Sequence, residues 1–240
     1  NLLSGGQAVI QVRMAGVAAN IISFSDDRVI VQAGASELPG TTGDVVLTID
    51  TGPEVVFQNG WTYNIVPGDI FTVEPNRGQF GTRVTVEGVS LLAGGDYITS
   101  ITLAGIEVLN ITAQTNNRVE FVANGSATAT AGDIIFTINT GATVRRLNGW
   151  TYVSPSLIAS SFPTRGQLGT YVTLRGSTLL AGGSSIASAS IGDVPARSIV
   201  SSNDSVVVIE AGGNATSVGN APSTITLIGN YDAVITYEDA

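Results

Sequence analysis

Residues 75–88 read PNRGQFGTRVTVEG, and residues 163–176 read PTRGQLGTYVTLRG. Both stretches begin with proline, continue through Arg-Gly-Gln and Gly-Thr, and then alternate apolar with polar residues. Alternation that includes β-branched residues is typical of a strand with one buried face. The glycines ahead of it allow the positive φ that a tight turn requires. The same turn and strand are therefore expected twice in this chain.

Other blocks recur at the same period. Leu-Leu-x-Gly-Gly begins at residues 2, 91 and 179, and Asn-Gly-Trp-Thr-Tyr begins at residues 59 and 148. A period near 88 residues is too long for a solenoid repeat and suits a small β-sandwich. Because no stretch has helical periodicity, the sequence predicts an all-β fold of tandem immunoglobulin-like β-sandwiches.

The repeat resembles the IPT/TIG family of immunoglobulin-like domains, of the plexin and transcription-factor type. The likeness rests on Pro-x-x-Gly-x-x-Gly-Thr-x-Val-Thr-x-x-Gly, on Leu-Leu-x-Gly-Gly and on the late Trp-Thr-Tyr strand, and it covers essentially the whole chain. It implies an incomplete domain at residues 1–66, without its first two strands, and complete domains at residues 69–153 and 155–239. In the third domain, Ile235 is expected at the position of the tryptophan.

The first domain has no residues that match residues 71–89 of the second. Something is expected to cover its open strand edge, either the preceding stretch of the same polypeptide or a strand from a neighbouring copy. We therefore expect a segment of a longer chain. The expected partners are neighbouring repeats or further copies of the chain, stacked head to tail in a fibre.

The composition excludes much chemistry. The sequence contains no His, Lys or Cys, and its net charge is −9. Catalytic triads with histidine, thiolate or histidine metal sites, Schiff bases and phosphate-loop lysines are therefore absent. An acidic surface is a poor partner for nucleic acid, and no apolar run is long enough to span a membrane. We expect no enzyme activity, no cofactor, no nucleic-acid partner and no membrane insertion by this segment.

Four side chains are candidates for ligand binding. Trp61 and Trp150 could stack on a ligand, but their shared position in the repeat favours packing in the sandwich cores. Asp26 and Asp27 could ligate Ca²⁺, yet no Asp-x-Asp-x-Asp loop accompanies them. A calcium site requires about six to eight converging oxygen ligands. The sequence therefore predicts no metal site.

Asn-x-Ser/Thr sequons occur at Asn110, Asn124, Asn203 and Asn214. About three would arise by chance in a chain so rich in Ser and Thr. Asn124 and Asn214 fall in equivalent loops. If a eukaryote secretes the protein, these two are expected to carry N-glycans first, because loop sequons are the accessible ones.

The tandem repeats and the low proportion of charged residues, 12%, are typical of an extracellular structural array. The predicted function is a cell-surface or secreted fibre or adhesive stalk, built from glycoprotein repeats. The alternative is a ligand- or carbohydrate-binding ectodomain array. A binder should carry exposed aromatic residues on one repeat that the others lack. The repeats share their aromatic residues, which favours the structural role.

Overall fold

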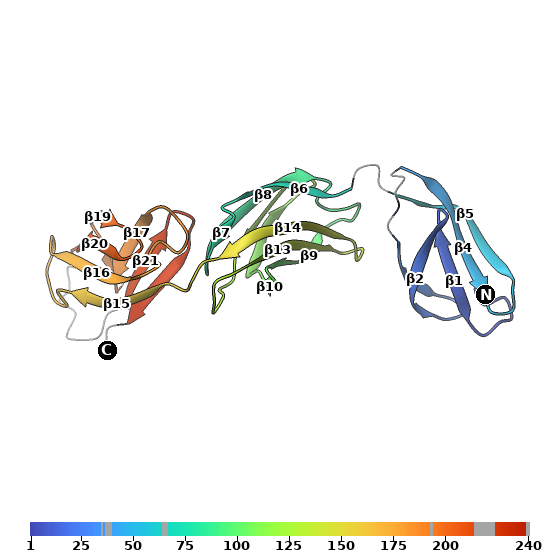
Figure 1. Cartoon of the computed structure of the whole chain (residues 1–240), viewed down its shortest axis with the longest axis horizontal. Helices are drawn as coiled ribbons and strands as arrows, with labels where there is room; N and C mark the ends of the chain where they lie inside the picture. The colour runs from blue at the N-terminus through green and yellow to red at the C-terminus, as the bar shows by residue number, and fades with distance from the viewer. Residues whose placement is uncertain (35, 37–39, 64–66, 193, 214–223, 239–240) are drawn as a thin grey trace. The chain divides into compact units, whose positions relative to one another are not determined.

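The computed structural model contains strands and turns, with no helix among the residues that it describes (Figure 1). It describes the chain except for residues 35, 37–39, 64–66, 193, 214–223 and 239–240. The described residues form two compact units, Asn1–Gly68 and Asp69–Ala240. The prediction of an all-β fold is confirmed. No described segment is a helix that could cross a membrane.

The first unit is a five-stranded antiparallel sheet with the strand order β3-β2-β1-β4-β5. The strands are β1 (Val9–Met14), β2 (Val17–Phe24), β3 (Val29–Gln32), β4 (Thr42–Ile49) and β5 (Glu54–Thr62). Its fully buried core is small, with Val12 and Ile49 at its centre. Trp61 is half-buried and packs against this core.

The second unit begins with a sandwich of two sheets, whose orders are β10-β9-β13-β14-β7 and β11-β12-β8-β6. Its strands are β6 (Asp69–Glu74), β7 (Arg77–Gly78), β8 (Arg83–Val89), β9 (Ile98–Leu103), β10 (Ile106–Glu107), β11 (Asn110–Gln114), β12 (Arg118–Val122), β13 (Thr130–Ile138) and β14 (Thr143–Tyr152). Val84 and Val86 point into the core, whereas Arg83 and Glu87 on the same strand are exposed. Strand alternation thus separates a dry face from a charged one.

The third sandwich pairs the sheets β15-β16-β20-β19 and β18-β17-β21-β22. Its strands are β15 (Leu157–Phe162), β16 (Tyr171–Ser177), β17 (Ile186–Ile191), β18 (Val194–Pro195), β19 (Ser198–Ser202), β20 (Val206–Glu210), β21 (Thr224–Gly229) and β22 (Val234–Glu238). Leu174, Val207 and Leu227 are fully buried at its centre. The buried residues of its core are aliphatic.

The strands of the first unit correspond to strands of the second sandwich at a constant spacing in the sequence. Strands β1 to β5 take the places of β9 to β14, and no described strand of the first unit takes the places of β6 and β8. The missing layer explains why Trp61 is half-buried while Trp150, at the same repeat position, is 0% exposed. What covers the first sheet stays a prediction.

The register of the last strand corrects the position of Ile235. Val144 pairs with Phe136 in the second sandwich, and Ile235 pairs with Leu227 in the third. Ile235 is therefore the counterpart of Val144, whereas Trp150 lies six residues further along β14. The expectation that Ile235 stands at the tryptophan position was wrong. The segment before β21 is three residues longer than its counterpart before β13, which accounts for three of these six positions. The other three arise because Thr236-Tyr237 resembles Thr151-Tyr152 without being its counterpart.

The turn ahead of β8 uses its glycines in two ways. Gly81 and its counterpart Gly169 have φ of 85° and 84°, as the sequence predicted. Gly78 is required for space instead, because a Cβ there would lie 2.4 Å from the Thr82 Oγ1. The backbone of the turn can therefore close tightly over the threonine.

Candidate functional site

The second and third sandwiches meet through backbone hydrogen bonds. The Arg83 amide donates to the Tyr231 carbonyl at 2.9 Å, and the Val234 amide donates to the Phe80 carbonyl at 3.0 Å. Phe80 and Arg83 belong to the turn ahead of β8, which we call the junction loop (residues 78–83). Tyr231 and Val234 belong to the turn between β21 and β22, which we call the junction turn (residues 230–234). Two bonds of opposite direction hold the turn against the loop.

An ion pair stands beside these bonds. The Arg83 Nε lies 3.0 Å from the Asp232 Oδ2, and the two side chains are 53% and 56% exposed. An exposed pair of this kind contributes less than about 1 kcal/mol. Its main effect is on geometry, because the guanidinium donates in a fixed direction.

Glycines allow the backbones to approach. A Cβ on Gly81 would lie 3.0 Å from the Val234 Cγ2 and 3.1 Å from the Asp232 carbonyl oxygen. A Cβ on Gly182 would lie 3.1 Å from the Gly78 Cα. Each sandwich therefore contributes a glycine to the contact, and a larger residue at either place would push the two sandwiches apart.

Gln79 ties the connector to the junction loop. This side chain is 7% exposed, and its Nε2 donates to the carbonyls of Ser126 and Val153 at 3.1 and 2.6 Å. Its Oε1 accepts from the Ser126 amide at 3.1 Å. Val153 begins the connector to the third sandwich. Three hydrogen bonds from one buried amide thus hold the last residue of the second sandwich beside the junction.

Two open hollows flank Tyr231. One, of about 470 Å³, is lined by Thr72, Thr85 and Asn230 together with charged side chains of both sandwiches. The other, of about 430 Å³, lies along residues 73–77 and 182–184. Tyr231, Glu74 and Pro75 line both hollows. The junction therefore carries a groove with one aromatic ring and many hydrogen-bonding groups.

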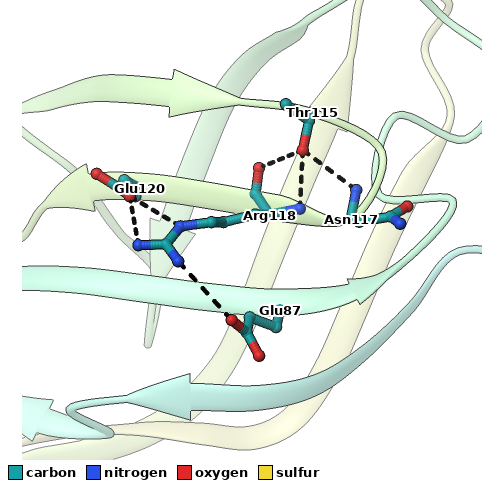
Figure 2. A network of polar contacts seen from close by, with 5 residues as sticks. All are labelled: Glu87, Thr115, Asn117, Arg118 and Glu120. Carbon is teal, nitrogen blue, oxygen red and sulfur yellow. Dashed lines mark hydrogen bonds and ion pairs between the residues drawn. The ribbon is translucent and has the colours of Figure 1, made fainter.

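The groove continues onto the outer face of the sheet β11-β12-β8-β6. Figure 2 shows Arg118 between two carboxylates, with its guanidinium 2.7 Å from Glu120 and 3.8 Å from Glu87. In the turn ahead of β12, the Thr115 hydroxyl accepts from the amides of Arg118 and Asn117. This face is a solvated network of charges.

The equivalent face of the third sandwich is mostly apolar and aromatic, and it keeps one charged residue, the exposed Arg175 in place of Glu87. Arg118 and Glu120 pair with Glu87 and Thr85, and their counterparts on β20 are valines. The charged residues of the second sandwich and their replacements are Glu74 by Phe162, Arg83 by Tyr171, Arg118 by Val206 and Glu120 by Val208. Phe162 and Tyr171 are 76% and 61% exposed. The two repeats thus share a fold but present different chemistry.

The sequons differ in accessibility. Asn110 and Asn203 are exposed, whereas Asn124 is half-buried. The third residue of the Asn124 sequon, Ser126, is 8% exposed, and its hydroxyl donates to the Thr128 carbonyl. Asn214 lies outside the described residues. The geometry therefore favours Asn110 and Asn203 over Asn124, contrary to the expected order, and glycosylation itself stays a prediction.

The other candidates do not form a site. Trp150 lies in the core as expected, with its ring 5.6 Å from that of Tyr152 in an edge-on arrangement. Asp26 accepts from the Leu3 amide at 3.1 Å, and Asp27 accepts from the Ser25 hydroxyl at 2.5 Å. Within the described ranges, no group of three acidic residues is placed to hold a metal ion.

Sequence reasoning missed the junction residues. Gln79 recurs as Gln167 in the repeat, so the repetition pointed to it, but its contacts with the connector come from the fold. Tyr231 and Asp232 have Thr140 and Gly141 as counterparts in the second sandwich, so no repeated signal marks them. They are specific to one end of one repeat.

Comparisons with known proteins agree with the fold. Residues 155–237 match the model of the IPT/TIG domain family, which confirms the resemblance over the third sandwich. No match to the sequence is found among curated proteins.

Several solved structures resemble the chain. The SGBP-B protein of the Bacteroides ovatus mixed-linkage glucan utilization locus, in complex with a mixed-linkage heptasaccharide, is 15% identical over 95% of this chain and 57% of its own, with a TM-score of 0.31. A surface glycan-binding protein from Prevotella bryantii is 12% identical over 68% of this chain and 36% of its own, with a TM-score of 0.30. The I9–I11 tandem of titin is 11% identical over 98% and 88%, with a TM-score of 0.27. The chain thus spans about a third to somewhat over a half of the two bacterial proteins, and TM-scores this low carry no inference about function.

Proposed function

Because residues 155–237 form an IPT/TIG domain joined directly to a second sandwich, we propose that this chain is a structural repeat array. It is a segment of a cell-surface or secreted fibre or adhesive stalk. The observation that supports this most is the junction, where two backbone hydrogen bonds, an ion pair and the Gln79 clamp hold consecutive sandwiches together. Direct contact of this kind resists bending, which a stalk requires.

The composition supports the same proposal. An array that works as a spacer needs closed cores and inert surfaces, and here His, Lys and Cys are all absent from the sequence. The cores of the second and third sandwiches each bury a set of large apolar side chains, with Trp150 and Leu174 among those at 0% exposure. The polar and charged groups of these sandwiches therefore lie at the junction and on the outer faces of the sheets.

Labelling of intact native cells tests the location. An antibody raised against the 240-residue chain should stain unpermeabilised cells, or find the protein in the medium, and brief protease treatment of intact cells should remove the signal. An antibody to a known intracellular protein is the control and should stain after permeabilisation only. Staining by the first antibody that also requires permeabilisation would contradict an extracellular array.

Carbohydrate binding is the second candidate, and the groove at Tyr231 favours it. An aromatic ring beside hydroxyl, amide and carboxylate groups is suited to a sugar, which presents both C–H faces and hydroxyls. A glycan array probed with the wild-type chain tests this, with Tyr231→Ala as the site variant and Tyr97→Ala as the control. Tyr97 is 51% exposed and does not line the groove. Binding that Tyr231→Ala abolishes and Tyr97→Ala leaves intact would establish the site.

A further inference from the structure

The third sandwich carries a second copy of the junction loop. Residues 166–171 match residues 78–83 of the second sandwich, and the internal bonds are the same. The Gly169 amide donates to the Ala211 carbonyl at 3.0 Å, as the Gly81 amide donates to the Ala123 carbonyl. In the second sandwich this loop is occupied by the junction turn. In the third, Leu168 and Tyr171 are 64% and 61% exposed.

The first sandwich carries the other half of the contact. The turn between β4 and β5, residues 50–54, has the same two closing bonds as the junction turn. The Gly52 amide donates to the Ile49 carbonyl at 2.9 Å, as the Asp232 amide donates to the Gly229 carbonyl at 3.0 Å. All five residues of this turn are exposed.

At the start of each turn, the side-chain oxygen of a carboxylate or carboxamide accepts a hydrogen bond from a backbone amide. The Asp50 Oδ1 accepts from the Gln7 amide at 3.0 Å, and the Asn230 Oδ1 accepts from the Ser184 amide at 2.9 Å. The carbonyl of Thr51 and the amide of Glu54 therefore stand where Tyr231 and Val234 present theirs in the junction.

The side chains of the two free halves match. Arg83 of the occupied loop faces Asp232 of its turn. The free loop has Tyr171 in place of the arginine, and the free turn has Gly52 in place of the aspartate. An arginine opposite Gly52 would lack its carboxylate partner, whereas a tyrosine loses no ion pair there. The loop of the third sandwich therefore lacks a charge at this position, and the turn at residues 50–54 also lacks one at the facing position.

We propose that the exposed loop of the third sandwich, at Leu168–Tyr171, docks the turn at residues 50–54 of a second copy of this chain, head to tail. Such a contact is heterologous and propagates instead of closing. The proposal rests on the array function above and gives it a mechanism of assembly. Continuity with the junction between the second and third sandwiches supports it, because the same backbone groups meet in the same order.

Sedimentation velocity of the 240-residue chain tests the contact, from about 10 µM to about 1 mM, because an interface this small is expected to be weak. The wild type should sediment faster as its concentration rises. Tyr171→Arg should weaken the association by up to about fivefold, since it removes the tyrosine ring from the contact and leaves an exposed guanidinium without a carboxylate partner. Tyr97→Arg places the same charge on an exposed tyrosine outside the contact and should leave the association unchanged.

A double variant makes the test specific. Tyr171→Arg with Gly52→Asp rebuilds the arginine–aspartate pair of the occupied junction and should restore association. Asp232 occupies the equivalent position with a φ of 65°, whereas Gly52 has a φ of 99°, so the aspartate requires the backbone of this turn to move towards the conformation of the junction turn; a Cβ on Gly52 meets nothing within 4 Å. A wild type that stays monomeric throughout, a Tyr171→Arg variant that associates equally well, or a double variant without rescue would overturn the proposal. These outcomes are independent of cell-surface labelling, so the array function can stand when the contact fails.

Discussion

The Gln79 side chain shows how much one buried amide can hold. It makes three hydrogen bonds, to Ser126 and Val153, at 7% exposure. We expect Gln79→Ala to lower the free energy of unfolding by about 2 kcal/mol, because the partners are left without bonds in a buried place. Urea denaturation monitored by far-UV circular dichroism, which reports the strands of every sandwich, measures this.

The repeat supplies the control for that experiment. Gln167 occupies the same position in the third sandwich and is exposed. Gln167→Ala should change the free energy of unfolding by less than about 0.5 kcal/mol, as exposed substitutions usually do. Equal losses in the two variants would mean that Gln79 acts through the turn and not through the connector.

The buried phenol of Tyr152 is expected to reduce the stability of the fold at alkaline pH. Burial raises the pKa of its phenol from 10.0 to about 12, and the hydroxyl has no hydrogen-bond partner among the described residues. A raised folded-state pKa means that stability is fully present below pH 10.0 and is lost as the pH rises towards about 12. Tyr152→Phe should leave stability at pH 8 equal or higher, because it removes an unsatisfied group, and should reduce the alkaline loss.

The measurement is thermal unfolding at several alkaline pH values, with phenolate absorbance recorded in parallel. In the wild type one tyrosine should ionise together with unfolding, and in Tyr152→Phe that step should disappear. Tyr63, whose pKa is also raised by burial, contributes a similar step from the first unit. An identical alkaline loss in the wild type and Tyr152→Phe would rule out Tyr152 as its source.

At the scale of elements, a carboxylate fixes the bulge in the last strand of each of the first two sandwiches. Asp133 Oδ1 accepts from the Asn148 amide at 2.7 Å, and Asp44 Oδ1 accepts from the Asn59 amide at 2.8 Å. Both asparagines have positive φ, near 50°. This bulge turns the strand so that the tryptophan that follows faces the core. The repeated Gly-Asp and Asn-Gly-Trp blocks are therefore the two sides of one contact.

Asp133→Ala should lower the free energy of unfolding near neutral pH, because the Asn148 amide loses its acceptor. The Asn148 amide and then Arg145 hold the pKa of Asp133 below its ordinary 3.8. Its contribution is therefore present above pH 3.8 and lost as the pH falls through that lowered pKa, so the difference between wild type and variant should shrink in acid. Arg145→Ala, which removes only an exposed ion pair, is the control and should cost less than about 1 kcal/mol. Denaturation curves at several pH values would refute the role if Asp133→Ala were neutral.

Sequence predicted elements well wherever the repeat was strict. The strand of residues 83–87, the turn glycine Gly81 and the buried Trp150 all follow from alternation, turn chemistry and shared repeat position. The prediction for Ile235 failed because Thr236-Tyr237 resembles Thr151-Tyr152 and because a three-residue insertion before β21 shifts the register further, and the pairing of strands cannot be read from a linear comparison. The expectation that Asn124 is accessible failed for a related reason. Only the fold shows that Gln79, more than forty residues away, buries the loop that carries it.

The candidate site could not be predicted from the sequence, and the reason is physical. Its members come from two sandwiches, and Tyr231 has no aromatic counterpart in the second repeat. The exposed pair Phe162 and Tyr171 has no counterpart there either, so aromatic side chains do differ between repeats. The aromatic residues that the repeats share do not include these exposed rings.

At the scale of the second unit, a matched pair of glycine variants isolates the junction. Gly81→Ala and Gly169→Ala both place a side chain at a φ near 85°, which costs about 1 to 2 kcal/mol in either loop. Only Gly81→Ala also brings a Cβ against Val234. Hydrogen exchange of the Arg83 and Val234 amides, which donate across the junction, should therefore be faster in Gly81→Ala than in the wild type.

In Gly169→Ala the exchange of both amides should stay as in the wild type. Amides inside β13 serve as an internal standard in both variants, because they report the second sandwich alone. Faster exchange at the junction in both variants, or in neither, would show that the loop and the turn are not held by direct contact at Gly81.

The second and third repeats each carry the loop at one end and the turn at the other, and this has an evolutionary consequence. A duplication that copies one repeat copies both halves of the joint, so the new repeat fits between its neighbours at once. Unequal crossing-over can then add or delete whole repeats without redesigning a contact. Only the pair at Arg83 and Asp232 must change together, since a guanidinium inherited without its carboxylate is left unmatched. The length of such an array is free to drift in a lineage while its joints stay the same.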